Sequence, residues 1–133
     1  MERVRLLLAD DNPAILDIVV KMLTANFVIA GAFTDGESVL QTFPYLMPDV
    51  IVLDISMGDV NGIEVARRLR EMDCKAKLIF LTVHEDIDFV RAAMAAGASG
   101  YVFKSAANSD LVAAINAALE GKLFYPSALQ NVH

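Results

Sequence analysis

The chain has 133 residues, of which 56% are hydrophobic and 21% are charged. This composition excludes a disordered or fibrous chain, and the length fits one domain that buries its own core. The formal net charge of −6 argues against a broad contact with nucleic acid phosphates. The single cysteine, Cys74, excludes an internal disulfide and a cysteine-rich zinc site, which fits the reducing cytoplasm.

Two further classes of protein are excluded by the hydrophobic pattern. No apolar run approaches the roughly 18 residues that cross a bilayer, and the first residues lack the apolar segment of a secretory signal. We therefore expect a cytoplasmic protein that makes no membrane contact.

Short apolar runs alternate with longer segments of helical periodicity along the chain. The first run, at 4–9, leads into a helix that Asn12 can cap and that Pro13 suits as its first residue. Further strands are expected at 27–33, 49–54, 77–83 and 100–103, with helices after 36 and at 63–72, 87–96 and 109–119. The run 49–54 is almost wholly apolar, as a central strand covered on both faces requires. The pattern predicts an α/β fold of five βα units around a doubly wound parallel sheet.

The last helix ends near Gly121, and no clear periodicity follows it. We expect one domain over residues 1–121, with residues 122–133 forming a C-terminal tail or the start of a linker.

Polar side chains stand at the carboxyl ends of four of these strands. Ligands of open α/β sheets bind beyond those ends, so we expect these side chains to share one pocket. They are Asp10, Asp11, Asp54, Thr82 and Lys104.

The charges and hydrogen-bonding groups of these five side chains complement one another. Three carboxylates repel one another by roughly 4 kcal/mol per pair at about 4 Å, so positive charge must offset them. Oxygen ligands of this kind suit Mg²⁺, which leaves room for a phosphoryl group, and one carboxylate can then act as a nucleophile toward phosphorus. Lys104 and the Thr82 hydroxyl would bind phosphoryl oxygens. Singly, each residue has an ordinary explanation as a helix cap, loop or surface residue; only their joint placement points to a site.

At these residues the sequence resembles the receiver domains of two-component response regulators. The resemblance covers about residues 4–121 and rests on the acidic pair 10–11, the strand 48–54, the loop 57–62, Thr82, the turn 97–101 and Lys104. Residues 101–105, Gly121 and the pair 125–126 further resemble the NarL/FixJ (LuxR-type) class. This resemblance implies a flavodoxin-like (βα)₅ sheet of strand order 2-1-3-4-5.

The resemblance also implies a role for each site residue. Asp54 would be the phospho-acceptor, while Asp10, Asp11, Asp54 and the backbone carbonyl of Ser56 would hold Mg²⁺ or Mn²⁺. Thr82 and Lys104 would bind the phosphoryl group. Thr82 and Tyr101 would form the switch that reports its arrival.

Two positions depart from the pattern, and two others suggest a further role. Gly58 and Ser105 stand where the family commonly has proline, which should loosen the loops beside the site without removing a catalytic atom.

Ser56 and His84 lie two residues beyond Asp54 and Thr82. There the family tunes hydrolysis of the acyl phosphate, so we expect this pair to affect dephosphorylation; a surface loop histidine is the alternative.

The resemblance implies a phosphorylatable signalling switch and not a conventional enzyme. A sensor histidine kinase would be the donor, output would pass to transcription through a C-terminal helix-turn-helix domain absent here, and phosphorylation could drive homodimerisation. This segment itself is not expected to bind DNA.

Three alternative functions would each require sequence features that differ from those of this chain. A haloacid-dehalogenase-type phosphatase has a second aspartate two residues after the first, and a flavodoxin-like cofactor binder has a Ser/Thr/Gly-rich phosphate loop; neither follows the first strand here. A degenerate receiver that only binds proteins would lack some of the key side chains, all of which are present.

Overall fold

The computed structural model describes residues 3–130 and contains a five-stranded parallel sheet of order β2-β1-β3-β4-β5. The strands are β1 (Arg5–Ala9), β2 (Val28–Phe33), β3 (Val50–Leu53), β4 (Lys77–Thr82) and β5 (Gly100–Phe103). The helices are α1 (Pro13–Leu23), α2 (Gly36–Leu46), α3 (Gly62–Glu71), α4 (Ile87–Ala95) and α5 (Ala107–Leu119). The predicted fold class and strand order are confirmed.

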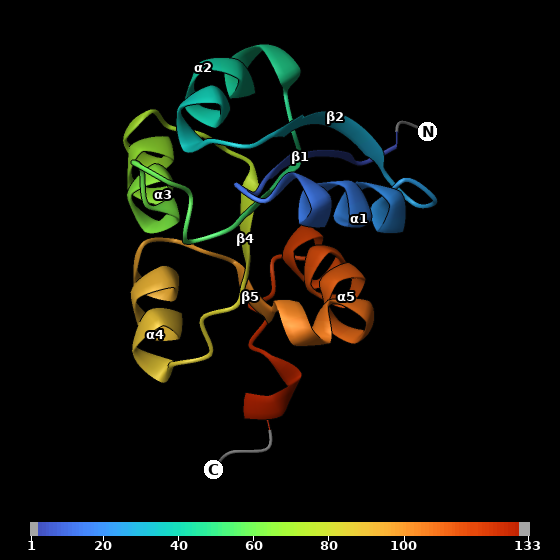
Figure 1. Ribbon diagram of the computed structural model, residues 1–133, viewed down its shortest axis with the longest axis vertical. Helices are drawn as coiled ribbons and strands as arrows, with labels where there is room; N and C mark the ends of the chain where they lie inside the picture. Colours follow the sequence, from blue (N-terminus) through green and yellow to red (C-terminus); the bar gives the residue numbers. More distant parts are fainter. Residues whose placement is uncertain (1–2, 131–133) are drawn as a thin grey trace.

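The strand interiors are apolar because helices cover both faces of the sheet, and the polar strand residues Arg5, Lys77 and Thr82 stand at strand ends (Figure 1). Alternate strand residues face opposite ways. Leu7, Ile51 and Phe80 pack with α2, α3 and α4, whereas Leu6, Val52 and Ile79 pack with α1 and α5. The two apolar layers fix the register of every strand, since a slip of one residue would exchange the faces.

Helix caps set where each polar strand end gives way to a helix. The Asn12 side chain accepts hydrogen bonds from the backbone N–H groups of Ala14 and Ile15, and Pro13 is the first residue of α1, as the sequence predicts. Asn61 caps α3 and Asp86 caps α4 in the same way. These caps fix the ends of the connections 10–12, 54–61 and 83–86, which lie at the carboxyl edge of the sheet.

The element boundaries lie within one residue of the expected ones, except that α5 begins at Ala107, two residues before the expected 109. Two further features were not predicted. Pro44 lies inside α2, which continues to Leu46 and ends at Met47 in a left-handed conformation (φ 50°). After α5 the chain does not leave the domain at once: Phe124 forms a parallel bridge with Gly100, and residues 127–129 form a 3₁₀ turn, η2. The predicted tail is therefore ordered against β5 as far as the described residues extend, and its last three residues lie outside them.

Candidate functional site

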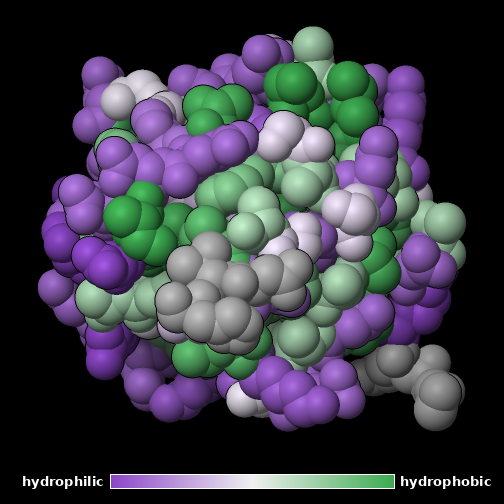
Figure 2. Space-filling model, turned by 90° about the horizontal axis from the view of Figure 1, so that it is seen from below, coloured by the Kyte–Doolittle hydropathy of each residue, from purple (hydrophilic) through white to green (hydrophobic). Residues whose placement is uncertain are grey.

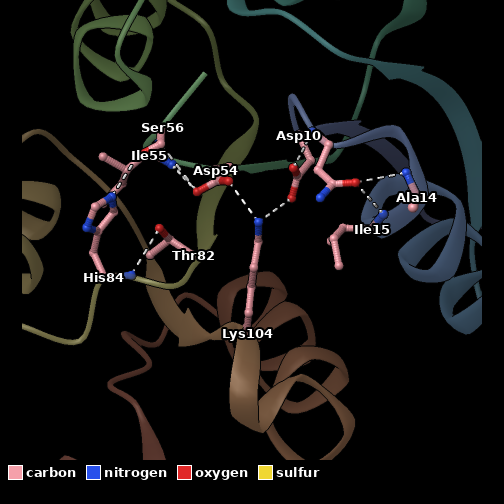
Figure 3. A network of polar contacts seen from close by, with 10 residues as sticks. Asp10, Ala14, Ile15, Asp54, Ile55, Ser56, Thr82, His84 and Lys104 are labelled. Atoms are coloured by element: carbon pink, nitrogen blue, oxygen red, sulfur yellow. Dashed lines mark hydrogen bonds and ion pairs between the residues drawn. The ribbon is translucent and has the colours of Figure 1, made fainter. Parts of the chain in front are cut away.

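Lys104 links the two buried carboxylates of the site. Its ammonium group donates to Asp10 Oδ2 at 2.7 Å and to Asp54 Oδ2 at 2.8 Å (Figure 3). Asp10 follows β1, Asp54 follows β3 and Lys104 follows β5, so the sheet brings together groups far apart in sequence. Both aspartates are about 4% exposed, and each therefore needs the charge of this lysine.

The remaining oxygens of the two carboxylates accept backbone hydrogen bonds. The Asp10 Oδ1 accepts from the N–H of Asn12 at 2.9 Å, and the Asp54 Oδ1 accepts from the N–H of Ile55 at 2.7 Å. The N–H of Ser56 points to the same Asp54 oxygen at 3.4 Å. The carboxylates are thus held in fixed orientations before any reaction, as a positioned nucleophile requires.

Asp11 completes a group of three carboxylates. One oxygen of Asp10, one of Asp11 and one of Asp54 lie within 4.8 Å of one another, and Asp11 is exposed while the other two are buried. Three carboxylates and one ammonium leave a net charge of −2, which a divalent cation would neutralise. An oxygen-only donor set with one solvent-facing member fits Mg²⁺, because Mg²⁺ keeps several water ligands.

Thr82 and His84 lie on the other side of Asp54 (Figure 3). Thr82 is fully buried, and its hydroxyl accepts from the His84 N–H at 3.4 Å. The His84 Nε2 and the Ser56 hydroxyl share a hydrogen bond of 2.7 Å. The His84 ring also stacks on Phe89, with the ring centres 4.4 Å apart. The Ser56–His84 contact joins the loops after β3 and β4. No sequence pattern indicated the stacking partner on α4.

Tyr101 lies beneath this loop, fully buried. Its hydroxyl donates to the carbonyl oxygen of His84 at 2.6 Å, and its ring packs edge-on against Phe103. Tyr101 thus connects β5 to the loop that carries His84, which places the predicted switch residue in contact with the site's surroundings.

Two glycines shape the loop after Asp54. A side chain at Gly62 would collide with the Asp54 carbonyl oxygen, since its Cβ would lie 2.0 Å away; the Gly62 N–H donates to the Ile55 carbonyl at 2.7 Å. Close approach of backbone to backbone therefore requires glycine there. Gly58 has φ +67°, which the proline common at this position in the family cannot adopt. The loop follows a path that glycine makes accessible.

The predicted site residues thus divide into two groups. Asp10, Asp54 and Lys104 are in direct contact, with Asp11 adjacent. Thr82, Ser56 and His84 form the neighbouring network. The Ser56 carbonyl as a metal ligand stays a prediction. Ser105, the other departure from the family pattern, donates from its hydroxyl to Glu85 at 3.0 Å and so ties the loop after β5 to the loop before α4.

Burial of the Tyr101 hydroxyl predicts a loss of stability at high pH. Burial, together with the negative charges of Asp54 and Asp86, raises the pKa of Tyr101 far above its ordinary value of 10.0. Burial opposes the charged form of Lys104, but the hydrogen bonds that it donates to Asp10 and Asp54, with the charges of these carboxylates, outweigh burial and raise the pKa of this amine above 10.5. In both cases the unfolded chain loses its proton first, so stability holds below about pH 10 and falls above it.

We therefore expect the melting temperature to fall as the pH rises from about pH 10, and to fall less steeply in Tyr101→Phe. Thermal melts followed by circular dichroism across this range measure the slope. Tyr125→Phe, at an exposed ring, is the matched control and should keep the wild-type slope. An identical slope in Tyr101→Phe and wild type would contradict the prediction.

Comparisons with known proteins agree with this geometry. Residues 6–116 match the response regulator receiver domain family. The DNA-binding transcriptional activator EvgA of Escherichia coli is 30% identical over 124 residues, which cover 92% of this chain and 61% of EvgA. The nitrate/nitrite response regulator protein NarL of Escherichia coli is 29% identical, with coverage of 98% and 62%. This chain therefore spans about three fifths of the length of these curated relatives.

Solved structures give the same result. A LuxR family response regulator from Aurantimonas sp. SI85-9A1 superposes with a TM-score of 0.87 at 30% identity, covering 92% of this chain and 89% of that one. The isolated receiver domain of RcsB from Salmonella enterica serovar Typhimurium, with the phosphomimetic BeF₃⁻, superposes with a TM-score of 0.87 at 27% identity, covering 96% of each chain. With the family match and the strand-end site, these likenesses show that the chain belongs to the response regulator receiver family, in its NarL/FixJ class.

Proposed function

We propose that this domain accepts a phosphoryl group on the carboxylate of Asp54 and thereby switches an output. The observation that carries the proposal is the position of the Lys104 ammonium, which contacts both Asp10 and Asp54 at the carboxyl edge of the sheet. A lysine placed this way neutralises the carboxylate that must attack phosphorus and can bind an incoming phosphoryl oxygen as a point charge.

The proposed reaction is a transfer from a phosphohistidine of a sensor kinase. An oxygen of Asp54 forms a bond to phosphorus, the bond between phosphorus and the imidazole nitrogen breaks, and the released imidazole takes a proton from water. The protein contributes mainly position and charge, as in other phosphoryl transfers. Water later cleaves the aspartyl phosphate slowly, which makes the domain a switch with weak catalytic activity of its own.

Asp10, Asp11 and Asp54 are the residues that would hold Mg²⁺, with Mn²⁺ as a substitute and the Ser56 carbonyl as a further ligand. When bound, the ion supplies charge neutralisation for the phosphoryl group. The chain's own residues orient the nucleophile: the Ile55 N–H fixes one oxygen of Asp54, and Lys104 fixes the other.

The switch would use Thr82 and Tyr101. Within residues 3–130, the hydrogen bond that the Thr82 hydroxyl makes is a long one of 3.4 Å, so the hydroxyl can turn to a phosphoryl oxygen at low cost. The His84 backbone carries both the N–H that donates to Thr82 and the carbonyl that accepts from Tyr101. A movement of Thr82 would therefore reach Tyr101 through this one residue.

The partners follow from the relatives. EvgA and NarL are named as a transcriptional activator and a response regulator, and one RcsB structure shows two dimers bound to two parallel DNAs. We propose that a sensor histidine kinase phosphorylates this domain in the cytoplasm, and that output passes to DNA through a following effector domain with dimerisation on phosphorylation. The charge of −6 supports an output that does not pass through direct DNA contact by this segment.

Intact mass spectrometry tests phosphoryl acceptance. The chain is incubated with phosphoramidate and Mg²⁺, and a mass gain of one phosphoryl group is expected. The same incubation with EDTA should show almost no gain, because the carboxylates then repel the donor. A chain that gains no mass with Mg²⁺ present would refute the proposed function.

Because Ser56 and His84 share a hydrogen bond, we expect the wild type to lose its phosphate more slowly than variants that lack this bond. The hydrogen bond to Ser56 and the stacking on Phe89 fix the imidazole beside the loop that follows Asp54. From there we expect it to shield the acyl phosphate from water. We expect His84→Ala and Ser56→Ala to shorten the phosphate half-life by about fivefold, the value of one hydrogen bond. Asn108→Ala, at an exposed residue of α5, is the control. An unchanged half-life in His84→Ala would dismiss this role.

A further inference from the structure

The segment after α5 is built like a short edge strand. Its side chains alternate: Leu123 and Tyr125 are 62% and 43% exposed, while Phe124 is partly buried and Pro126 is buried. The Tyr101 N–H donates to the Phe124 carbonyl at 3.0 Å, and the Phe124 N–H donates to the Ser99 carbonyl at 2.9 Å. We call residues 124–130 the strap. It covers part of the β5 edge that the sheet otherwise leaves open.

The strap contacts the apolar layers on both faces of the sheet. Phe124 packs with the layer under α1 and α5, whereas Leu129 packs with the layer that contains Tyr101 and Phe103. Gly100 makes the crossing possible, since a Cβ there would lie 3.3 Å from the Phe124 Cβ and 2.8 Å from Ile79. The strap thus passes around the edge of the sheet from one face to the other, below β5 in Figure 1.

A buried carboxylate on α5 fastens the far end of the strap. Asp110 is 4% exposed, and its Oδ2 accepts from the Ser127 N–H at 3.0 Å. Its Oδ1 accepts from the Ser109 hydroxyl at 3.2 Å. The Asp110 carboxylate lies outside the group of Asp10, Asp11 and Asp54 and has no part in the phosphoryl site. A charge buried to this extent needs its partners, so it favours the docked strap.

Tyr101 is therefore joined to the site at its hydroxyl and to the strap at its backbone. The hydroxyl donates to the His84 carbonyl at 2.6 Å, and the N–H of the same residue donates to Phe124. Seen from below, the end of the molecule near the strap carries apolar groups separated by hydrophilic ones (Figure 2). The exposed Leu123 and Tyr125 leave the outer side of this segment available to whatever follows in the chain.

We propose that the strap is the output element of this domain: a change at Tyr101 alters the docking of residues 124–130, and through them the chain that follows. The inference rests on the proposed function, because phosphorylation is the event that would move Tyr101. Linkage makes the coupling reciprocal, so loosening the strap must also change the affinity of the site for a phosphoryl mimic.

Hydrogen exchange followed by mass spectrometry, on the 133-residue chain with Mg²⁺ and with or without beryllofluoride, tests the forward direction. In the wild type we expect exchange to change by about fivefold both in the site loop 55–62 and in the strap. In Tyr101→Phe, which lacks the hydroxyl but keeps the backbone N–H, the loop should respond while the strap does not. A wild-type loop that responds without the strap would overturn the inference and leave the proposed function intact. No response in either segment would overturn both.

The effect of the strap on the phosphoryl site is tested by changing the contact between Asp110 and Ser127 that anchors the strap. Ser127→Pro deletes the N–H that donates to Asp110, and proline is accepted at the first position of a helical turn, so the fold should survive. Asp110→Ala deletes the acceptor, and Asp110→Asn keeps an acceptor oxygen. We expect strap exchange about fivefold faster in the first two variants, a matching change in beryllofluoride affinity, and recovery in Asp110→Asn. Faster strap exchange with unchanged affinity would overturn the coupling.

Discussion

Asp54→Ala should fold normally and gain no phosphoryl group from phosphoramidate in the presence of Mg²⁺. Asp54 is the carboxylate whose two oxygens are held by Ile55 and Lys104, and alanine offers no nucleophile in its place. The fold should survive because Lys104 keeps its contact of 2.7 Å with Asp10. The free energy of unfolding should therefore change by less than about 2 kcal/mol. Intact mass and urea unfolding measure the two effects.

Asp59→Ala is the matched control for this experiment. Asp59 is an exposed aspartate in the loop that follows Asp54, and it lies outside the group of three carboxylates. It should incorporate phosphate like the wild type. Equal incorporation in Asp54→Ala and wild type would overturn the assignment of the acceptor.

Lys104→Ala should destabilise the domain by about 3 kcal/mol without Mg²⁺, the low end of what breaking a buried ion pair costs. The lysine side chain is 16% exposed, while those of Asp10 and Asp54 are 6% and 4% exposed, so water cannot fully replace the lost charge. The two carboxylates would then face each other and Asp11 without compensation. Urea unfolding at low and high Mg²⁺ measures the effect.

The same variant should respond more strongly to Mg²⁺ than the wild type does. Removing one positive charge leaves the acidic group at a net charge of −3, which attracts a divalent cation more strongly than −2. Metal binding should therefore persist, while beryllofluoride no longer changes hydrogen exchange at the switch. Lys21→Ala, which breaks an exposed pair with Asp17, should show no measurable loss of stability. A Lys104→Ala protein as stable as the wild type at low Mg²⁺ would contradict the proposed charge balance.

The partners of Asp10 can be predicted from its place at a strand end, whereas the partner of Asp110 cannot. Asp10 follows a strand that the sequence identifies, and the rule that parallel strands present their carboxyl ends together predicts its neighbours. Asp110 lies in a helix, and its partner is a backbone N–H 17 residues away in a segment without periodicity. A local pattern predicts a neighbouring backbone partner, as at the Asn12 cap, but it cannot reveal one 17 residues away.

The sequence by itself determined the element order, the parallel α/β class and the group Asp10, Asp11, Asp54 and Lys104, because apolar periodicity and strand ends are local features that a parallel sheet converts into position. The strand order was implied by the resemblance to receiver domains. Only the tertiary structure decided that His84 pairs with Ser56 and stacks on Phe89, that Tyr101 holds the His84 carbonyl, and that Phe124 docks on β5. These contacts join segments that lie far apart in the sequence, and no periodic pattern of residues indicates that they meet. Their formation depends on how loops and the chain after α5 pack once the sheet exists.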